Sequence, residues 1–306
     1  MVLLTGAGGF VGQAIRRQFR RSFPNELLLA VSRRSIEPSE RAPDGARTER
    51  CDLRNRSQVA RLPLNRVAGL IHVAAATPGS GGDPFEDTVL ATANLLAALR
   101  NSPLSSVLLI SSVSVYDWRT PRPGTVMLNE DCACVAADDY GRSKLVQELL
   151  IQAFAGSRLR TCIFRPSSIY GPGMPLHQVL GRWLIQALRA EALRLTGPRG
   201  YRQNYVFVED VAALVCRAHA EARDGVYNLF SSDTLELPAL AEIVRQVTGN
   251  PHPVEDARQD GPSPRLVFDN SRLVNTFRPS FTPFVEALRT TVTSLKTRNV
   301  EPSEIS

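Results

Sequence analysis

Lysine is almost missing from this chain. Of its 306 residues, 36 are lysine or arginine, yet only Lys144 and Lys296 are lysines. A chain that uses arginine so freely would place arginine wherever a surface needs only a positive charge. Lys144 therefore needs a specific explanation, and a compact ammonium group on a flexible stem that must reach particular polar partners provides one.

Long apolar segments are also missing. No run reaches the roughly 18 apolar residues needed to cross a bilayer. The apolar start at residues 1–4 continues into glycines, with no basic leader or cleavage site. Hydrophobic residues make up 43% of the chain and charged residues 22%, as in an ordinary globular protein. We therefore expect a cytoplasmic protein with no membrane partner.

Cysteine is too scarce to form a disulfide framework. The five cysteines are odd in number and widely spread, which favours reduced thiols. Cys132 and Cys134 lie close together, but no second cluster of cysteine or histidine accompanies them. We therefore expect no metal site.

The positive charge is not concentrated anywhere along the chain. A net charge of +6 occurs without a dense basic block or a basic stripe with interleaved aromatic residues, so we predict no nucleic-acid partner. An anionic small-molecule ligand would account for the charge, and a general preference for arginine on a solvated surface accounts for most of it.

Strand-like and helix-like patterns alternate as far as Pro172. The expected strands are residues 2–5, 27–31, 70–76, 107–110, 161–164, 205–208 and 225–229, with another closing at 51–53. The expected helices are 13–21, 84–100, 140–155, 237–248 and 283–296, and one that begins at 209. This repeat predicts an α/β protein with a Rossmann-type doubly wound parallel sheet, followed by a smaller C-terminal α/β lobe.

A glycine turn joins the first expected strand to the first expected helix. Its spacing is Gly6-x-x-Gly9-x-x-Gly12. Such spacing allows a tight turn, lets the backbone approach a pyrophosphate, and points the amino end of the helix at that charge. The context predicts dinucleotide binding, against the alternative of a turn that serves packing alone.

The chain is accordingly expected to divide by function. We assign residues 1–168 to an NAD(P)-binding Rossmann domain, with a return segment at about 204–230. Residues 169–203 and 231–298 would form a substrate-binding lobe. Residues 299–306 are polar and are expected to be a frayed tail.

Tyr140 and Lys144 form the most informative pair in the sequence. Asp138 and Asp139 suit the first turn of a helix, and residues four apart lie one above the other on a helix face. A free phenol has a pKa of about 10, and a nearby ammonium group favours the phenolate and lowers that pKa. The pair is therefore predicted to transfer a proton, with Lys144 activating Tyr140.

Cofactor preference is indicated after the second expected strand. Many dinucleotide-binding folds place an acidic residue there, on the adenosine ribose, but this chain has Ser32, Arg33 and Arg34. Arginine attracts a 2′-phosphate that a carboxylate would repel. We predict NADP in preference to NAD, with the alternative that the arginines face solvent.

Further polar or small residues follow other strands. Asp52 is placed to accept a hydrogen bond from an adenine amino group, and the small Ala74 and Ala75 leave room for a cofactor. Ser112 lies at the carboxyl end of a parallel strand, where it could bind a substrate oxygen. His72, within a buried strand, is interpreted as a hydrogen-bonded structural residue.

With these segments in view, the chain resembles the extended short-chain dehydrogenase/reductases, a group of nucleotide-sugar epimerases, dehydratases and reductases. The resemblance spans nearly the whole chain and rests on residues 5–12, 52–53, 72–75, 112–116, 140–144, 165–173 and 208–212. It implies that the catalytic residues are Ser112, Tyr140 and Lys144. It implies that the cofactor is bound by Gly6, Gly9, Phe10, Val11, Gly12, Ser32, Arg33, Arg34, Asp52, Leu53, Ala74, Ala75, Tyr140, Lys144 and Pro166. It implies that the substrate is bound by Ser112, Tyr116, Arg202 and Gln203.

The chain departs from the pattern of these enzymes at three places. Thr88 stands where they usually have a helix asparagine. Gln203 stands where an arginine often holds substrate phosphates, with Arg202 beside it. Val113 and Ser114 stand where the sugar 4,6-dehydratases carry an acidic residue, so no acid protonates a departing hydroxyl and dehydration is not expected.

The expected activity is hydride transfer at a secondary alcohol or ketone of a nucleotide sugar, by a C4 epimerase or a 4-keto reductase. The alternative is an NADPH-dependent reductase of a non-sugar carbonyl compound, which Gln203 favours. A third possibility is a non-catalytic NADP(H) sensor, although such a protein would not need Ser112, Tyr140 and Lys144. The resemblance also implies a homodimer.

Overall fold

The computed structural model describes residues 1–34, 47–77, 79, 81–117, 124–196, 199–258 and 265–298. The chain divides into two compact units. Unit 1 comprises Met1–Asp117, Glu130–Pro166 and Val211–Leu229, and unit 2 comprises Trp118–Asn129, Ser167–Asp210 and Phe230–Ser306. The expected tail at 299–306 lies outside the described residues.

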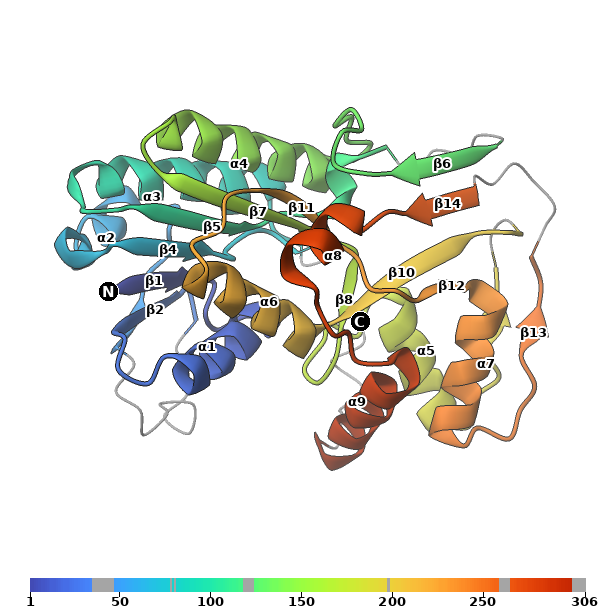
Figure 1. Cartoon of the computed structure of the whole chain (residues 1–306). Coiled ribbons are helices and arrows are strands. Elements are labelled where there is room, and N and C mark those ends of the chain that lie inside the picture. The colour runs from blue at the N-terminus through green and yellow to red at the C-terminus, as the bar shows by residue number, and fades with distance from the viewer. Residues whose placement is uncertain are drawn as a thin grey trace. The chain divides into compact units, whose positions relative to one another are not determined.

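Unit 1 is built on a seven-stranded sheet in the order β11-β7-β5-β4-β1-β2-β3, in which every neighbouring pair is parallel (Figure 1). Its strands are β1 (Val2–Thr5), β2 (Leu28–Ser32), β3 (Arg47–Arg50), β4 (Gly69–His72), β5 (Ser106–Ile110), β7 (Arg160–Pro166) and β11 (Gly225–Leu229). β1, β2 and β4 are buried along their whole length because both faces of the sheet are covered. The predicted doubly wound parallel sheet is confirmed.

Helices cover both faces of this sheet. They are α1 (Phe10–Ser22), α2 (Arg56–Val59), α3 (Ala91–Ala98), α4 (Asp139–Ala155) and α6 (Val208–Ala220). Figure 1 shows α3 and α4 on one face and α1 and α6 on the other. Leu3, Leu70 and Val107 from the sheet share one apolar core with Leu95 of α3 and Ile151 of α4. This packing holds the start of α4 beside the strand ends.

The strand order reverses at the centre of the sheet. β1 lies between β2 and β4, with Val2 opposite both Leu28 and Gly69. The connections from β1 and β4 therefore run to opposite sides and leave a crevice at the carboxyl ends of these two strands. Ligands of open α/β sheets bind at such a switch point.

The helix expected over residues 84–100 is not one regular α-helix. It begins as a π-helix (Phe85–Leu90), continues as α3 and ends in a 3₁₀ turn (Leu99–Asn101). The Asp83 carboxylate accepts hydrogen bonds from the backbone nitrogens of Phe85 and Glu86 at 2.7 and 3.2 Å, so the irregular part has a fixed start. Short π-helical insertions are frequent at functional sites.

Unit 2 contains three small sheets. Its strands are β6 (Thr125–Leu128), β8 (Ser168–Tyr170), β9 (Arg194–Leu195), β10 (Arg202–Phe207), β12 (Thr234–Glu236), β13 (Glu255–Asp256) and β14 (Arg265–Phe268). They pair as β12-β10-β8, β13-β9 and β14-β6. Its helices are α5 (Val179–Leu188), α7 (Leu237–Thr248), α8 (Ser271–Phe277) and α9 (Phe284–Arg298). Packed rings of Tyr170, Tyr205, Phe207 and Phe284 form part of its core.

The expected return segment at 204–230 is divided between the two units. β10 pairs with β8 and β12 inside unit 2, and the chain re-enters unit 1 at Val211, within α6. The apolar sequence of β10 would suit the large sheet of unit 1 as well as a sheet of unit 2. Its membership is therefore known only from its pairing with β8 and β12. None of the described helices is both long and apolar enough to cross a bilayer.

Candidate active site

The glycine turn forms a cradle at the carboxyl end of β1. Gly6 has a φ of +66°, and a Cβ there would lie 2.8 Å from the backbone nitrogen of Ala74. A Cβ on Gly12 would overlap the carbonyl oxygen of Gly6. α1 begins at Phe10 with Gly9 at its N-cap, and Gly9 has no side chain that could cap the amide groups of the first turn. The geometry of this cradle would suit a dinucleotide pyrophosphate, and its binding there stays a prediction.

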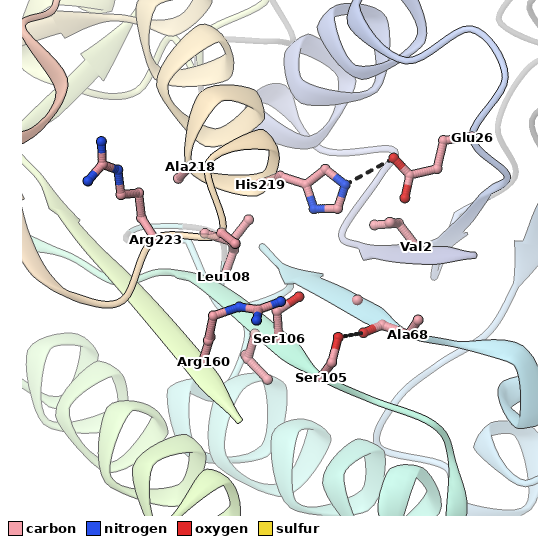
Figure 2. A pocket seen from close by; sticks show the side chains of 13 residues that line it. Val2, Glu26, Ala68, Ser105, Ser106, Leu108, Arg160, Ala218, His219 and Arg223 are labelled. Atoms are coloured by element: carbon pink, nitrogen blue, oxygen red, sulfur yellow. Dashed lines mark hydrogen bonds and ion pairs between the residues drawn. The ribbon is translucent and has the colours of Figure 1, made fainter. Parts of the chain in front are cut away.

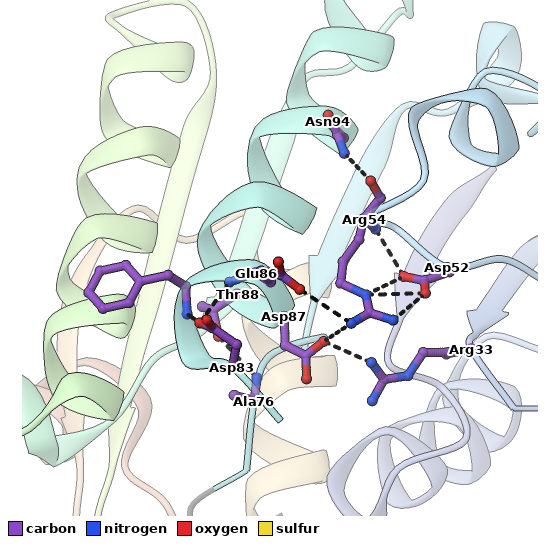
Figure 3. Close-up of polar contacts among 10 residues, drawn as sticks. Arg33, Asp52, Arg54, Ala76, Asp83, Glu86, Asp87, Thr88 and Asn94 are labelled. Atoms are coloured by element: carbon purple, nitrogen blue, oxygen red, sulfur yellow. Dashed lines mark hydrogen bonds and ion pairs between the residues drawn. The ribbon is translucent and has the colours of Figure 1, made fainter. Parts of the chain in front are cut away.

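Most of the other predicted cofactor residues of unit 1 lie at or just after the carboxyl ends of strands of the same sheet. Ser32 ends β2, Asp52 and Leu53 follow β3, Ala74 and Ala75 follow β4, Pro166 ends β7, and Val11 lies on α1. The Asp52 carboxylate is bound by Arg54 at 2.7 Å, and these hydrogen bonds lower the pKa of Asp52 (Figure 3). An adenine amino group would therefore share this carboxylate with Arg54.

The two arginines after β2 differ in their surroundings. Arg33 donates a hydrogen bond from Nη1 to Asp87 Oδ1 at 2.7 Å (Figure 3). The backbone nitrogen of Arg34 donates to Ser32 Oγ at 3.3 Å, and none of the described acidic residues forms an ion pair with its guanidinium. No sequence pattern predicted the Arg33–Asp87 pair, which joins residues 54 positions apart.

Lys144 is completely buried on α4, one helical turn after the half-buried Tyr140. Its Nζ donates hydrogen bonds to the carbonyl oxygen of Ile110 at 2.6 Å and to Gln147 Oε1 at 2.5 Å. Burial lowers the pKa of Lys144 to about 7, and the charge of Glu148 opposes that shift. The rare lysine thus sits where an ammonium ion is costly.

A close backbone contact brings the start of α4 to the serine segment after β5. A Cβ on Gly141 would overlap the carbonyl oxygen of Ser114, so only glycine allows this approach. Ser112 Oγ is buried and accepts a hydrogen bond from the backbone nitrogen of Ser114 at 3.1 Å. The structure therefore places the segment of Ser112 against the helical turn of Tyr140.

A chain of hydrogen bonds connects the first strand to α4. The Thr92 hydroxyl donates to the carbonyl oxygen of Thr88 at 2.6 Å, so its oxygen accepts from His72 Nε2 and Gln147 Nε2, each at 2.9 Å. His72 therefore carries its hydrogen on Nε2, and Nδ1 accepts from Thr5 Oγ1 at 2.7 Å.

Burial, together with the nearby charge of Lys144, lowers the pKa of His72 to about 3. A neutral histidine with both ring nitrogens hydrogen-bonded is a structural residue, as the sequence predicted. Gln147, which the sequence analysis missed, is held by Thr92 so that its oxygen faces Lys144. Its position three residues after Lys144 on the same helix was the available signal.

A buried ion pair lies behind the candidate site and was also missed. Arg165 donates two hydrogen bonds to Glu148, at 3.0 and 2.7 Å, and one to the Tyr116 hydroxyl at 2.7 Å. Burial alone would lower the pKa of Arg165, but Glu148 raises it above its ordinary value. The Tyr116 hydroxyl donates to Asn228 Oδ1 at 2.9 Å, so a substrate would have to replace one of these partners.

Replacing Glu148 by leucine should destabilise the protein by about 3–5 kcal/mol, because the Arg165 guanidinium would be left buried without a carboxylate. Urea unfolding would measure this loss. Replacing Arg165 by methionine in the same chain should recover much of it, since no charge then stays buried. A double variant less stable than the single one would contradict this explanation.

The predicted substrate residues Arg202 and Gln203 lie on β10 of unit 2. Arg202 forms an ion pair with Glu236 at 2.8 Å. Gln203 donates a hydrogen bond to Ser168 Oγ and accepts one from the Tyr201 hydroxyl at 2.9 Å. Both side chains thus have partners within their own unit. The described residues include no group of three or more histidine, cysteine or acidic side chains able to hold a metal ion.

A cavity of about 170 Å³ lies at the other end of the sheet (Figure 2). Its walls include Val2, Ser106 and Arg160, at or next to the amino ends of β1, β5 and β7. His219 Nε2 and Glu26 Oε2, 3.0 Å apart, form another part of its lining. Ligands of parallel sheets bind at the carboxyl ends of strands, so this cavity is not part of the candidate site.

The sheet, its switch point and the glycine cradle are those of a Rossmann-type dinucleotide-binding protein. Within that class, residues 2–229 match the model of the NAD dependent epimerase/dehydratase family, and the chain belongs to this family. The resemblance to the extended short-chain dehydrogenase/reductases is thereby confirmed.

Two relatives and one solved structure illustrate what the chain is similar to. The dTDP-4-dehydro-6-deoxy-D-allose reductase of a Streptomyces species is 24% identical over 293 residues, which cover 89% of each chain. The trifunctional UDP-glucose 4,6-dehydratase/UDP-4-keto-6-deoxy-D-glucose 3,5-epimerase/UDP-4-keto-L-rhamnose-reductase of Arabidopsis thaliana is 24% identical over 244 residues, or 74% of this chain. The chain matches 36% of the length of that plant protein.

The solved structure is the UDP-glucose 4-epimerase of Thermotoga maritima with UDP-glucose. It has a TM-score of 0.81 and 18% sequence identity, with 98% of this chain and 99% of that chain covered. At this identity the likeness shows the fold, which agrees with the predicted architecture.

Proposed function

We propose that this protein transfers a hydride between a nicotinamide cofactor and a secondary alcohol or ketone of a nucleotide sugar. The observation that carries the proposal is Lys144, a fully buried lysine one turn from Tyr140 and hydrogen-bonded to the end of β5. Burying a positive charge lowers the stability of the fold, so a fully buried lysine is a candidate functional residue. A protein that only sensed the cofactor would gain nothing from it.

Each catalytic residue has a chemical role in this proposal. The bound nicotinamide would accept or return the hydride. Tyr140 takes the substrate hydroxyl proton in oxidation and gives it back in reduction. With a pKa near 7, Lys144 can lose or regain a proton at Nζ near neutral pH and so support that transfer. Ser112 steadies the substrate oxygen with a hydrogen bond.

We propose a C4 epimerase or a 4-keto reductase in preference to a 4,6-dehydratase. Val113 and Ser114 form the 3₁₀ turn after Ser112, and both are buried. Neither carries an acid that could protonate a departing hydroxyl. The names of the relatives include a 4,6-dehydratase as well as epimerase and reductase activities, so this preference rests on Val113 and Ser114.

A screen of UDP-, GDP- and dTDP-sugars tests this function. Purified protein should convert at least one of them, and Tyr140→Phe should slow the conversion by about 10²-fold or more. Isomer formation without net loss of reduced cofactor would identify an epimerase, and stoichiometric consumption of NADPH or NADH would identify a 4-keto reductase. No conversion of any nucleotide sugar would reject the substrate class.

A reductase of non-sugar carbonyl compounds is the second candidate. It is favoured by Gln203, which replaces a phosphate-binding arginine and is held by Ser168 and Tyr201. The neighbouring Arg202 is already paired with Glu236. Reduction of free ketones, with no activity on the sugars, would favour this candidate.

We propose NADP as the preferred cofactor of this NAD-binding family member. No carboxylate stands at the end of β2, where Ser32, Arg33 and Arg34 follow one another. We further propose that unit 1 binds the cofactor, that unit 2 carries the substrate residues Arg202 and Gln203, and that the protein is a homodimer. Affinities for NADP and NAD, and the mass in solution, test these points.

A further inference from the structure

A group of alternating charges lies beside the end of β2 in unit 1. Asp87, on the π-helix, has a side chain only 7% exposed, whereas that of Arg33 is 53% exposed. The Asp87 Oδ1 atom lies 2.7 Å from Arg33 Nη1 and 3.3 Å from Arg54 Nη1 (Figure 3). One buried carboxylate oxygen therefore faces two arginines from different loops.

The two arginines depend on Asp87 to different degrees. Arg54 also binds the Asp52 carboxylate through Nε and Nη2, at 3.1 and 2.7 Å (Figure 3). Asp87 is the acidic partner that the described residues supply to Arg33. Loss of the Asp87 charge would thus free Arg33, while Arg54 would keep a carboxylate.

The position of Arg33 makes this pairing relevant to the cofactor. It directly follows β2, the strand after which Rossmann folds bind the adenosine ribose. A 2′-phosphate near neutral pH carries between one and two negative charges, and arginine binds it through charge-assisted hydrogen bonds. In this structure one of those donors, Arg33 Nη1, already faces the Asp87 carboxylate, which neutralises part of the charge that a 2′-phosphate would use. A 2′-hydroxyl is uncharged and does not depend on that charge.

We propose that Asp87 is a specificity-determining residue, which competes with the 2′-phosphate for Arg33 and limits the preference for NADP over NAD. This inference rests on the proposed cofactor site, but not on the substrate or the reaction. Asp87 comes from an element far from β2 in sequence and is held by the irregular start of the helix. A 2′-phosphate would compete with this carboxylate for the Arg33 guanidinium, whereas NAD leaves the pair intact.

The test measures affinity in the whole protein, using quenching of NADPH and NADH fluorescence. Asp87→Asn should tighten NADPH binding about tenfold, as expected for a freed charged hydrogen bond, and change NADH binding less than about threefold. Asp87→Asn should likewise tighten the binding of 2′,5′-ADP about tenfold and change the binding of AMP less than about threefold, when both are measured as competitors. These compounds isolate the 2′-phosphate from the nicotinamide.

Glu86→Gln is the matched control. It also removes one negative charge from the π-helix, but its carboxylate is 60% exposed and lies 3.7 Å from Arg54. It should shift NADPH binding by less than about twofold, because an exposed charge is screened by water and salt. Equal gains in Asp87→Asn and Glu86→Gln would mean a general charge effect and would overturn the proposal.

Arg33→Ala supplies a second, independent measurement. It should weaken NADPH binding less than about threefold in the parent, and should erase the tenfold gain in the Asp87→Asn background. If Asp87→Asn binds NADPH and NADH as the parent does, this inference fails alone. If the parent binds neither dinucleotide, the proposed function fails and takes this inference with it.

Discussion

Replacing Tyr140 by phenylalanine should lower kcat by about 10²- to 10⁴-fold and leave cofactor affinity within about threefold of the parent. Phenylalanine keeps the ring and removes only the hydroxyl that gives or takes the proton. Tyr140 is half-buried and lies on the first turn of α4, whose packing on Ser114 depends on Gly141 and not on the phenol. The fold should therefore survive the substitution.

Steady-state kinetics with the substrate identified by the nucleotide-sugar screen would measure kcat, and fluorescence quenching would measure cofactor binding. Tyr227→Phe is a suitable control, because this buried tyrosine on β11 of unit 1 donates its hydroxyl to the carbonyl oxygen of Asp224 at 2.8 Å and lies outside the predicted site residues. It should retain the parent rate. A Tyr140→Phe protein as active as the parent would remove the proton-transfer role at the centre of the proposal.

The sequence predicted the sheet of unit 1 well because its strands are buried on both faces. Residues 2–5 and 225–229 are strands with the expected bounds, and β5 begins one residue earlier than expected. Continuous apolar runs that alternate with glycine turns and amphipathic helices are typical of a parallel sheet covered on both faces, and few other folds contain this pattern. The turn of the glycine cradle was predictable from the spacing of its glycines, but the close approach of Gly6 to Ala74 was not.

Contacts between distant residues were not predictable from pattern alone. The Arg33–Asp87 pair joins residues 54 positions apart, and the position of Asp87 depends on a π-helical start that no propensity indicates. The pairing of Glu148 with Arg165 is similar, because an arginine in a strand reads as exposed until its partner is known. The strand β10 was expected near unit 1 and pairs within unit 2, since pairing is decided by tertiary contacts.

Thr88 ties the segment after β4 to the irregular helix. Where related enzymes have asparagine, the Thr88 hydroxyl accepts a hydrogen bond from the backbone nitrogen of Ala76 at 3.0 Å. Its carbonyl oxygen accepts one from Thr92. The segment after β4 is thus tied to the helix by a different side chain, beside the candidate cofactor site.

Replacing Lys144 by methionine should give the second large effect, a fall in kcat of about 10²-fold or more, because Tyr140 loses the group that supports its proton transfer. Methionine has a similar length and suits a buried site. Lys296→Met, which changes the exposed lysine of α9, is the matched control and should keep the parent activity. Comparable activity in Lys144→Met and the parent would refute the role of this lysine.

The same substitution should change how stability depends on pH. The pKa of Lys144 is about 7 in the folded protein and about 10.5 in the unfolded chain. Between these values the unfolded chain binds more protons, so this lysine makes the folded state more stable as the pH rises and less stable as it falls towards 7. The free energy of unfolding of the parent, relative to Lys144→Met, should therefore increase by about 1 kcal/mol per pH unit from pH 7.5 to 9.

Urea unfolding of both proteins at several pH values would measure this difference. Comparing the two proteins cancels the titration of the buried thiols, which they share and whose raised pKa values act in the opposite direction. A constant difference across this range would show that Lys144 keeps its proton in the folded protein. The rising difference expected here would show that Lys144 lowers the stability of the folded protein near neutral pH. A purely structural position would not require such a residue, whereas a residue that supports proton transfer by Tyr140 would.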